Sequence, residues 1–243
     1  MNFINRFFTD EEIKDNRLLI KGDEVHHIKN VLKLKEKEKV CCVKGSMEYI
    51  LRIIEFTKDS VLFEVIDKVQ SESENKFLLT LFQATPKGDK TDFIIEKATE
   101  AGANAVYIIN TLRSVAKITN ENMRKKQERF SKIAESAACQ SGRVAIPEVK
   151  CFLKLSEVDF SDFDLLILCY EDEDKTTLKE ILLKNKDKKK IGVFIGPEGG
   201  IDKSEVSFLL EKGFLCASLG KRILRCETAG LYTLSNINYE LSE

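Results

Sequence analysis

Short apolar runs lie close together in the N-terminal part of the chain. They are Val40 to Val43, Tyr49 to Ile54 and Ser60 to Ile66, with the turn residues Lys44, Gly45 and Ser46 between the first two. Runs of this kind predict β-strands in a small barrel or a compact antiparallel sheet. Ahead of them, residues 23–32 predict a short helix, for which Asp23 is the expected N-cap.

The pattern changes after the polar segment Ser71 to Lys76, which is the best candidate for a domain boundary. Fully apolar runs then alternate with helical patterns. The runs are Phe77 to Phe82, Ala105 to Ile109, Leu165 to Leu168, Ile191 to Ile195 and Leu215 to Leu219, and the helical patterns cover 91–101, 122–140, 176–186, 203–212 and 228–240. This alternation predicts an α/β fold whose parallel sheet is covered on both faces.

The helix expected at 203–212 carries signals at both ends. Asp202 and Glu205 have the spacing of a capping box, and Gly213 follows the last helical residue.

Composition narrows the class of protein. The chain has 243 residues, of which 43% are hydrophobic, so it can bury one large core or two small ones and is not disordered. It has 39 Lys and Arg residues against 40 Asp and Glu residues, a net charge of -1. A strongly basic nucleic-acid binder would differ, and any RNA contact must therefore come from local basic patches.

Cysteine usage and the N-terminus bear on location. The seven cysteines form no Cys-x-x-Cys pair and only two histidines accompany them, so we expect no metal site. An odd number of cysteines without a pattern is typical of a reducing cytoplasm. The first residues lack the apolar stretch of a signal peptide, and no run approaches the ~20 apolar residues that span a bilayer. We expect a cytoplasmic protein without membrane contact.

The segment Gly196-Pro197-Glu198-Gly199-Gly200 directly follows an apolar run. In open α/β sheets, ligands bind at the carboxyl ends of the strands, which is where this loop is expected. It is neither a Gly-x-Gly-x-x-Gly nor a Walker motif, so a nucleotide phosphate is not the expected ligand. Taken alone, the segment also fits an ordinary strand-to-helix turn.

The segment Leu219 to Ala229 follows another apolar run in the same way. It leads into the last predicted helix, which Thr228 could cap. From composition alone, Arg222, Arg225 and Glu227 could be surface charges or an ion pair. Two such loops at neighbouring strand ends would, however, build one pocket.

Together, these two segments resemble the signature of the RsmE family, which are small-subunit ribosomal RNA methyltransferases that methylate N3 of a uridine. The resemblance extends along nearly the whole chain. Its further blocks, in order, are Arg6-Phe7-Phe8, His27 to Leu34, Gln83 to Lys87, Ile95 to Gly102, Arg113-Ser114 and Gln140 to Arg143. The ordered set is far more specific than any single block.

The resemblance implies a fold. Residues 1–72 are expected to form a PUA-like RNA-binding β-barrel, and residues 73–243 a SPOUT methyltransferase domain with a mostly parallel sheet and a trefoil knot. Because knots are rare among folds, this last expectation comes from the resemblance alone. The resemblance also implies a homodimer, S-adenosyl-L-methionine (AdoMet) as cofactor, and 16S rRNA or the small ribosomal subunit as partner.

The resemblance further implies site residues. The cofactor-binding set is Leu168, Tyr170, Glu171, Gly196, Pro197, Glu198, Gly199, Gly200, Ile201, Leu219, Gly220, Arg222, Ile223 and Leu224. The RNA-binding set is Arg6, His27, Lys33, Lys87, Arg113, Gln140 and Arg143. His27 could equally be a packed residue of the short helix, and most other lysines of so lysine-rich a chain are expected to be solvated.

The chain departs from the family pattern at a few positions. Lys33 stands where relatives have arginine, which keeps the charge but loses a bidentate fork. Ser136 and Cys139 replace two glutamates of the family, which weakens any mechanism that makes those carboxylates catalytic. Two alternatives therefore stay open: a SPOUT enzyme acting on another RNA, and a non-catalytic ribosome-assembly protein. A nicotinamide dehydrogenase is disfavoured because its glycine fingerprint is missing.

The chemistry of uridine methylation indicates which groups are needed. Loss of the N3 proton leaves a negative charge on the two carbonyl oxygens of the base, and the fixed donors of an arginine suit that charge. We hypothesise that Arg225 stabilises it. Glu227 is the candidate for orienting Arg225 or for accepting the proton. Positioning and electrostatics are expected to supply most of the catalysis.

Overall fold

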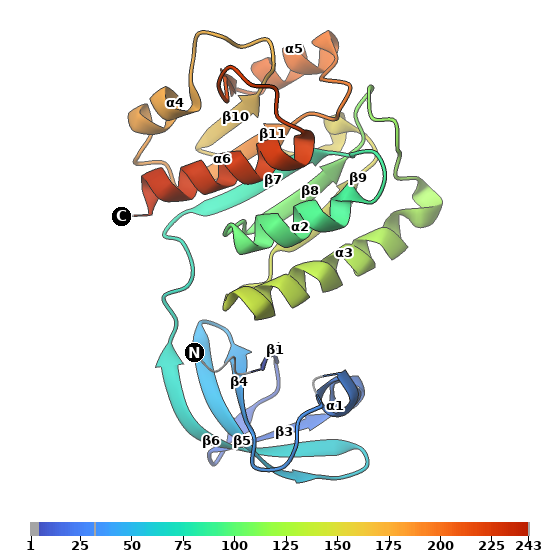
Figure 1. Ribbon diagram of the computed structural model, residues 1–243, viewed down its shortest axis with the longest axis vertical. Coiled ribbons are helices and arrows are strands. Elements are labelled where there is room, and N and C mark those ends of the chain that lie inside the picture. The colour runs from blue at the N-terminus through green and yellow to red at the C-terminus, as the bar shows by residue number, and fades with distance from the viewer. Residues whose placement is uncertain (1–4, 32, 243) are drawn as a thin grey trace. The chain divides into compact units, whose positions relative to one another are not determined.

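The structure is a computed structural model that describes residues 5–31 and 33–242. The chain forms two compact units (Figure 1). The N-terminal unit comprises Met1–Glu74 together with Cys139–Ala145, and the C-terminal unit comprises Asn75–Ala138 and Ile146–Glu243. The division falls inside the polar segment Ser71 to Lys76. The return of residues 139–145 to the first unit was not predicted.

The N-terminal unit is built on a six-stranded sheet. Its strands are β1 (Arg6–Phe8), β2 (Ile13–Lys14), β3 (Arg17–Lys21), β4 (Lys39–Lys44), β5 (Met47–Phe56) and β6 (Ser60–Gln70), in the order β1-β4-β5-β6-β3-β2. The pairing of β1 with β4 is parallel and every other pairing is antiparallel. The three predicted strands are confirmed as β4, β5 and β6.

The long strands β5 and β6 enclose the core of this unit. Register shifts after Ile50 and Ile53 interrupt their ladder, and irregularities of this kind bend a strand. Alternate residues such as Leu51 and Phe63 are fully buried against Leu18 of β3. The sheet therefore curves around its own apolar cluster.

The short helix before β4 was predicted over residues 23–32. The chain is α-helical over α1 (Asp23–His26) and continues as a π-helix, η1 (His27–Val31). Residue 32 and the side chains of Asp23 and His27 lie outside the described part of the chain. The capping role of Asp23 and the RNA-binding role of His27 therefore stay predictions.

The C-terminal unit contains a six-stranded, entirely parallel sheet. Its strands are β7 (Leu78–Ala84), β8 (Ala105–Ile109), β9 (Glu148–Phe152), β10 (Leu165–Cys169), β11 (Lys190–Ile195) and β12 (Phe214–Ala217), in the order β12-β10-β11-β7-β8-β9. β9 was not predicted, because this edge strand alternates Glu148 and Lys150 with its buried residues Val149 and Cys151.

Helices cover both faces of the sheet, as predicted. They are α2 (Lys90–Glu100), α3 (Asn120–Ser141), α4 (Leu178–Lys184), α5 (Lys203–Glu211) and α6 (Cys226–Leu241), with a short 3-10 helix η2 (Leu155–Glu157). Buried residues of α2, α3, α4 and α6 share one apolar cluster with alternate strand residues. Those of α5 and η2 share a second cluster with Phe82 and Phe194. In the described parts of the chain, no helix is long and apolar enough to cross a bilayer.

Two predicted helix caps are corrected by the structure. Asp202 caps α5 by accepting a hydrogen bond from the backbone N–H of Ser204 at 3.0 Å, but the carboxylate of Glu205 accepts from the N–H of Leu112 instead of closing a capping box. Helix α6 begins at Cys226 with Arg225 at its N-cap position, so Thr228 lies within the first turn. The end of α5 is as predicted, with Gly213 at a φ of +91°.

Candidate active site at the carboxyl edge of the parallel sheet

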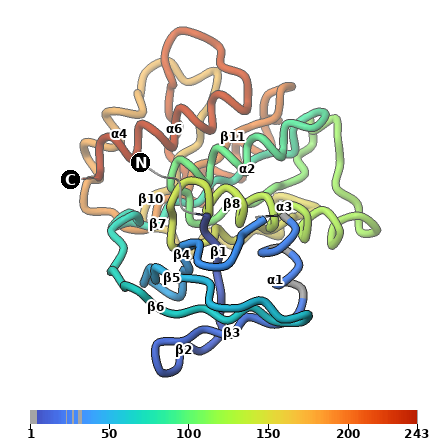
Figure 2. Tube along the Cα trace, turned by 60° about the horizontal axis from the view of Figure 1, so that its bottom comes forward, coloured from blue at the N-terminus to red at the C-terminus, as the bar shows by residue number. Residues whose placement is uncertain are grey.

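The register of three neighbouring strands brings the predicted cofactor loops together. Cys169, the last residue of β10, pairs with Ile195 of β11 on one side and with Ala217 of β12 on the other. The loops that begin at Tyr170, Gly196 and Ser218 therefore leave the sheet in one row. Figure 2 shows the loops before α4 and α6 at the same end of the C-terminal unit.

Backbone hydrogen bonds join two of these loops. The N–H of Tyr170 donates to the carbonyl of Ala217 at 3.2 Å, and the N–H of Ser218 donates to the carbonyl of Thr176 at 2.8 Å. The N–H of Leu178 then donates to the carbonyl of Ser218. The loop after β10 is thus joined at both of its ends to the start of the loop after β12.

The glycines of the loop after β11 are required by neighbouring protein atoms. Gly200 has a φ of +71°, and a Cβ there would lie 2.2 Å from Oε1 of Glu171 in the adjacent loop. A Cβ on Gly196 would lie 2.6 Å from Cγ1 of Ile201. These glycines let the loop fold onto itself and against Glu171.

The predicted cofactor residues differ widely in exposure. The side chains of Leu168 and Ile201 are 0% and 2% exposed and belong to the apolar cluster beneath α5. They support the loops from below, so any contact of these two residues with a cofactor is expected through their backbone. Ile223 is 95% exposed, and Arg222 is also exposed.

A cavity of about 330 Å³ lies between α4, α6 and the start of the loop after β12. Two predicted cofactor residues, Leu219 and Gly220, line it together with Thr177, Ser218 and Tyr232. Gly220 has a φ of +106°, which a glycine adopts without strain, and a Cβ there would meet open space.

Lys90, the first residue of α2, connects two of the predicted loops and was not among the residues predicted from the sequence. Its ammonium lies 2.9 Å from Oε1 of Glu198 and 3.1 Å from Oε2 of Glu227. The backbone N–H of Lys87 also donates to both carboxylate oxygens of Glu198, at 3.2 Å each. The segment after β7 thus holds the loop after β11 and the first turn of α6.

The pKa values of this cluster follow from its contacts. Hydrogen bonds to Glu198 and then to Glu227 raise the pKa of Lys90. Burial acts to raise the pKa of Glu227, but hydrogen bonds from its own backbone, from the Cys226 thiol and from Lys90 lower it overall. Burial and the hydrogen bond to Glu227 raise the pKa of Cys226 to about 12, so this thiol is neutral near pH 7.

Glu198, Cys226 and Glu227 place one ligand atom each within 4.8 Å of one another, the spacing of a metal site. The ammonium of Lys90 already contacts both carboxylates of this trio. The positive charge that the trio needs is therefore supplied by the chain itself.

Arg225 is exposed at the N-cap position of α6. Among the described residues, no contact joins its guanidinium to Glu227, whose carboxylate pairs with Lys90. The predicted role of Glu227 in orienting Arg225 is therefore not supported. A carboxylate whose pKa is lowered is also a weak general base, which disfavours its predicted role as proton acceptor.

Arg113 and Lys87, both predicted to bind RNA, lie on loops at the same edge of the sheet. Nη1 of Arg113 donates to the carbonyl of Gly199 at 3.4 Å, and its Nη2 lies 3.4 Å from Oδ2 of Asp202. The side chains of both cations are exposed. They present positive charge beside the cofactor loops.

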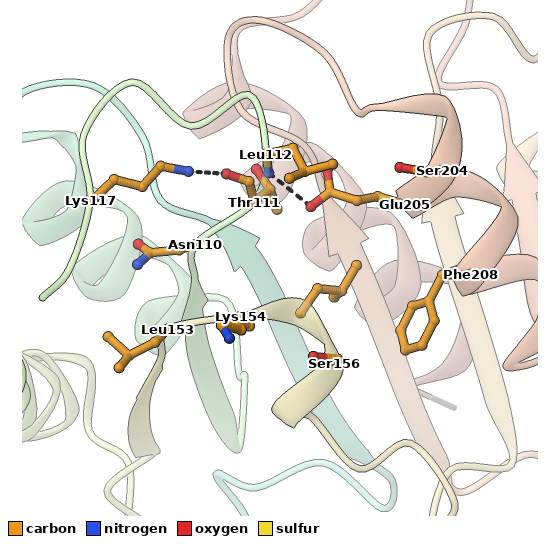
Figure 3. A pocket seen from close by; sticks show the side chains of 11 residues that line it. Asn110, Thr111, Leu112, Lys117, Leu153, Lys154, Ser156, Ser204, Glu205 and Phe208 are labelled. Carbon is orange, nitrogen blue, oxygen red and sulfur yellow. Dashed lines mark hydrogen bonds between the residues drawn. The ribbon is translucent and has the colours of Figure 1, made fainter. Parts of the chain in front are cut away.

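A second cavity, of about 440 Å³, adjoins the loop that carries Arg113 (Figure 3). In its lining, the carboxylate of Glu205 accepts a hydrogen bond from the N–H of Leu112 at 2.9 Å, and the ammonium of Lys117 donates to the carbonyl of Thr111. Phe208 and Leu155 supply apolar lining. Glu205 and Lys117 thus fix the loop after β8, which explains why Glu205 does not complete the capping box.

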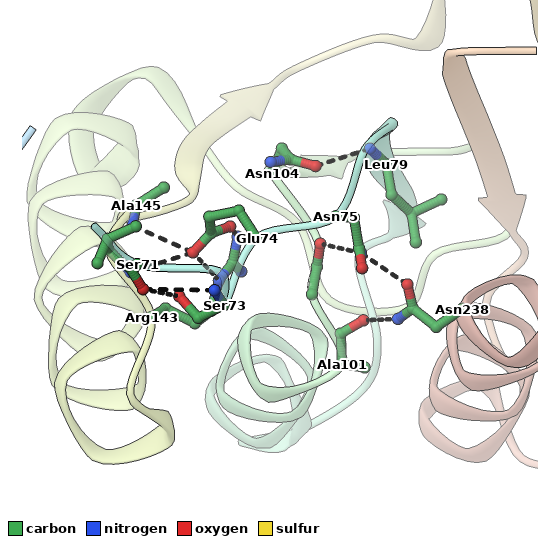
Figure 4. A network of polar contacts seen from close by, with 12 residues as sticks. Ser71, Ser73, Glu74, Asn75, Leu79, Ala101, Asn104, Arg143, Ala145 and Asn238 are labelled. Carbon is green, nitrogen blue, oxygen red and sulfur yellow. Dashed lines mark hydrogen bonds and ion pairs between the residues drawn. The ribbon is translucent and has the colours of Figure 1, made fainter. Parts of the chain in front are cut away.

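In the N-terminal unit, Arg143 is buried and paired. Its side chain is 4% exposed, and its Nε and Nη2 donate to the two carboxylate oxygens of Glu74 at 3.2 and 2.6 Å (Figure 4). Its carbonyl accepts from Nη1 of Arg6, whose Nη2 lies 2.8 Å from Oε2 of Glu48. The donors of Arg143 and Arg6 therefore hold this unit together, and the RNA-binding roles of both residues stay predictions.

The other residues predicted to bind RNA in this unit are placed differently. Gln140 and Lys33 are exposed, and Lys33 has a φ of +52°. Their RNA-binding roles stay predictions.

Asparagines join the start of the C-terminal unit to its last helix, also drawn in Figure 4. Nδ2 of Asn75 donates to Oδ1 of Asn238 at 2.6 Å, and Nδ2 of Asn238 donates to the carbonyl of Ala101. A Cβ on Gly102 would lie 2.7 Å from the side-chain Nδ2 of Asn75. These contacts fix α6, and with it the loop that precedes this helix.

Comparison with known proteins assigns the chain to a family. The family model described as RNA methyltransferase domain matches residues 73–238, and the one described as RNA methyltransferase PUA domain matches residues 20–66. The chain belongs to this RNA methyltransferase family. This establishes a methyltransferase domain that is preceded by a PUA domain, as the resemblance implied.

Individual relatives agree with the family. The chain is 36% identical over 229 residues to ribosomal RNA small subunit methyltransferase E of Bacillus subtilis, covering 91% of this chain and 89% of the relative. A putative methyltransferase from Legionella pneumophila, solved with the bound cofactor SAM, has a TM-score of 0.86 at 26% identity, covering 97% of each chain. Ribosomal RNA small subunit methyltransferase E from Neisseria gonorrhoeae, bound to S-adenosyl methionine, has a TM-score of 0.84 at 26% identity, covering 97% of each chain.

Proposed function

We propose that this protein transfers a methyl group from AdoMet to N3 of a uridine in the 16S RNA of the small ribosomal subunit. The observation that carries the proposal is the convergence of the loops after β10, β11 and β12 at one edge of the parallel sheet. This convergence lies within the part of the chain that matches the RNA methyltransferase domain.

The cofactor would be held by these loops. AdoMet is a cation with a polar amino-acid end and a planar adenine, and the loops offer backbone groups beside an apolar cluster. Glu171 and Glu198 carry negative charge on this edge. The relative from Legionella pneumophila, which covers 97% of this chain, was solved with bound SAM, which is another abbreviation for AdoMet.

Arg225 is the proposed catalytic residue. Its guanidinium is exposed one residue before α6, next to the cofactor loop that ends at Leu224. When the N3 proton leaves, the uracil carbonyl oxygens gain negative charge, and the fixed N–H donors of an arginine stabilise it. The carbon–sulfur bond to the methyl group then breaks as the N3 lone pair forms the new carbon–nitrogen bond.

The N3 proton passes to solvent or to a proton-accepting group of the RNA-bound complex. Glu227 is not proposed as that base, because Lys90 and the Cys226 thiol bond its carboxylate and lower its pKa.

Substitution of Arg225 tests the mechanism. We expect Arg225→Ala to lower kcat for RNA methylation about a hundredfold, since it removes donors that act in the transition state, with the Kd for AdoMet little changed. Arg225→Lys keeps the charge without the fork and should recover part of the loss. Lys221→Ala, an exposed cation on the same loop, is the matched control. Normal turnover by folded Arg225→Ala would refute the role.

Mass-spectrometric mapping of methylated uridines in rRNA from a deletion strain tests the function. We expect the N3-methyluridine signal to disappear from the small-subunit rRNA and to return when the gene is restored. An unchanged signal would refute the proposed function. Absence of AdoMet binding by calorimetry would instead favour a non-catalytic assembly protein, and a signal lost from another RNA would favour the other SPOUT alternative.

The two parts of the chain have different proposed roles. Residues 1–72 hold the RNA and residues 73–243 carry out methyl transfer, as a homodimer in the cytoplasm. The last helix, α6, passes through a knotted chain. Lys87 and Arg113 contact RNA phosphates beside the cofactor loops, so the affinity for RNA falls as salt concentration rises.

A further inference from the structure

The contacts of Lys90 differ from those of an ordinary surface lysine. Its side chain is 33% exposed, and the carboxylates that it contacts are 32% exposed for Glu198 and 15% exposed for Glu227. These carboxylates come from different segments, one from the loop after β11 and one from the first turn of α6. A single ammonium therefore bridges the proposed cofactor loop and the helix that Arg225 precedes.

Removing that ammonium would leave unbalanced negative charge. Glu198, Glu227 and the Cys226 sulfur have ligand atoms within 4.8 Å of one another, and both carboxylates have lowered pKa values, so both are ionised near neutral pH. Like charges at this separation repel each other. Without Lys90, the two segments would be driven apart.

We propose that Lys90 is a positioning residue that takes the place of a metal ion, setting the spacing between the AdoMet loop at Glu198 and the segment that carries Arg225. This inference rests on the proposed function. An ammonium suits such a place because three donors on a flexible stem can serve two carboxylates at once.

The same helix provides a matched control. Lys97 also bridges two carboxylates, at 2.7 Å from Glu96 and 2.8 Å from Glu100, and its side chain is 29% exposed. Both of its partners belong to α2 itself, so Lys97 joins no separate segments. A difference between the Lys90 and Lys97 variants therefore reports the bridging of loops rather than the loss of a charged pair.

Binding of AdoMet separates the two lysines without any RNA. By calorimetry we expect Lys90→Met to raise the Kd for AdoMet about tenfold, because two charge-assisted hydrogen bonds that order the loop are lost. Lys97→Met should stay within about twofold of the wild type, as exposed pairs contribute little. Lys90→Arg restores a cation and should recover most of the affinity. Equal affinities for Lys90→Met and Lys97→Met would overturn the proposal.

Methylation kinetics add a second readout. Because Lys90 holds both segments, Lys90→Met should raise KM for AdoMet and also lower kcat, while Lys97→Met changes neither. A wild-type protein that binds AdoMet but methylates no RNA would refute the proposed function and leave the AdoMet-binding test of Lys90 intact.

Metal binding gives a readout that a merely structural lysine would not. In Lys90→Ala, the thiol and carboxylates of the trio would be open to Zn²⁺, which binds sulfur and oxygen ligands of this kind. We expect this variant to bind Zn²⁺ at least about tenfold more tightly than the wild type or Lys97→Ala, with release of the thiol proton. The added substitution Cys226→Ser should remove the gain. Equal Zn²⁺ affinity of folded Lys90→Ala and the wild type would contradict the idea that Lys90 fills a cation site.

Discussion

Each unit of the molecule contains a cluster of charged side chains, and the two clusters differ in burial and in the geometry of their cation. In the N-terminal unit, Arg143 is 4% exposed and meets Glu74 through two N–H donors. In the C-terminal unit, Lys90 is 33% exposed and meets two carboxylates through one ammonium. The planar fork of arginine fixes one geometry, whereas an ammonium tolerates small movements of its partners.

The surroundings of the two clusters also differ, because Glu74 is bonded to backbone groups of a returning segment and the other carboxylates lie at loops. Glu74 also accepts hydrogen bonds from the backbone N–H groups of Val144 and Ala145, so its carboxylate closes one end of the segment that returns to the N-terminal unit. The carboxylates around Lys90 lie on loops proposed to bind a ligand. The buried guanidinium of Arg143 suits a contact that stays fixed. The partly exposed ammonium of Lys90 suits an edge that is proposed to admit a cofactor.

The largest effect should come from breaking the buried pair. Arg143→Ala leaves the carboxylate of Glu74 without its partner, and the loss of one member of a buried pair costs about 3 kcal/mol of unfolding free energy. Arg124, 92% exposed and paired with Glu128 at 2.9 Å, is the control, and Arg124→Ala should cost less than about 0.5 kcal/mol. Urea denaturation measures both. A loss below about 1 kcal/mol for Arg143→Ala would remove the distinction between the clusters.

A smaller effect is expected where the loops approach each other. Gly200→Ala must adopt a φ of +71° and would displace Glu171, while Gly22→Ala at +74° would meet open space. Both should lose about 1–2 kcal/mol from backbone strain. Only Gly200→Ala should also weaken AdoMet binding. If Gly22→Ala weakened it equally, the loop contact would not be responsible.

The smallest effect concerns pH. Burial acts to raise the pKa of Glu74, but the hydrogen bonds and charge of Arg143 and the two backbone N–H groups lower it overall from 4.5. A carboxyl with a lower pKa in the folded state adds stability that is present above its unfolded value and is lost as pH falls through the folded value. We therefore expect the melting temperature to fall below pH 4.5, and to fall less steeply in Glu74→Gln. Equal slopes would contradict this.

Most of the C-terminal fold could be predicted from the sequence because its buried strands are mostly apolar. The run Ala105 to Ile109 matches β8 at both ends. The strands that were missed are short or carry charged residues. β1 and β2 have three and two residues, β3 has a charged residue at each end of five, and β9 is an edge strand with charged residues at its less buried positions. Periodicity carries little information over such lengths.

The candidate site divides in a similar way. Two of its loops, at Gly196 to Gly200 and Leu219 to Ala229, could be predicted because each follows an apolar run and carries a distinctive motif, whereas the loop after β10 was expected only from the family resemblance. Lys90 could not be predicted, since one lysine in a lysine-rich chain has no pattern, and its partners Glu198 and Glu227 are remote in sequence. The burial of Arg143 was also invisible, because its partner Glu74 lies in a polar segment that reads as a linker.

The parallel pairing of β7 with β11 has a consequence for how the chain folds. Leu79 and Ile191 are neighbours in the sheet, although β8, β9 and β10 are all made between them. During synthesis β7 can pair with β8 early, but its other edge must wait until β11 has left the ribosome. Since pairings between distant segments slow folding, the centre of this sheet is expected to close late. The edge proposed to bind the cofactor would then be the last part of the molecule to mature.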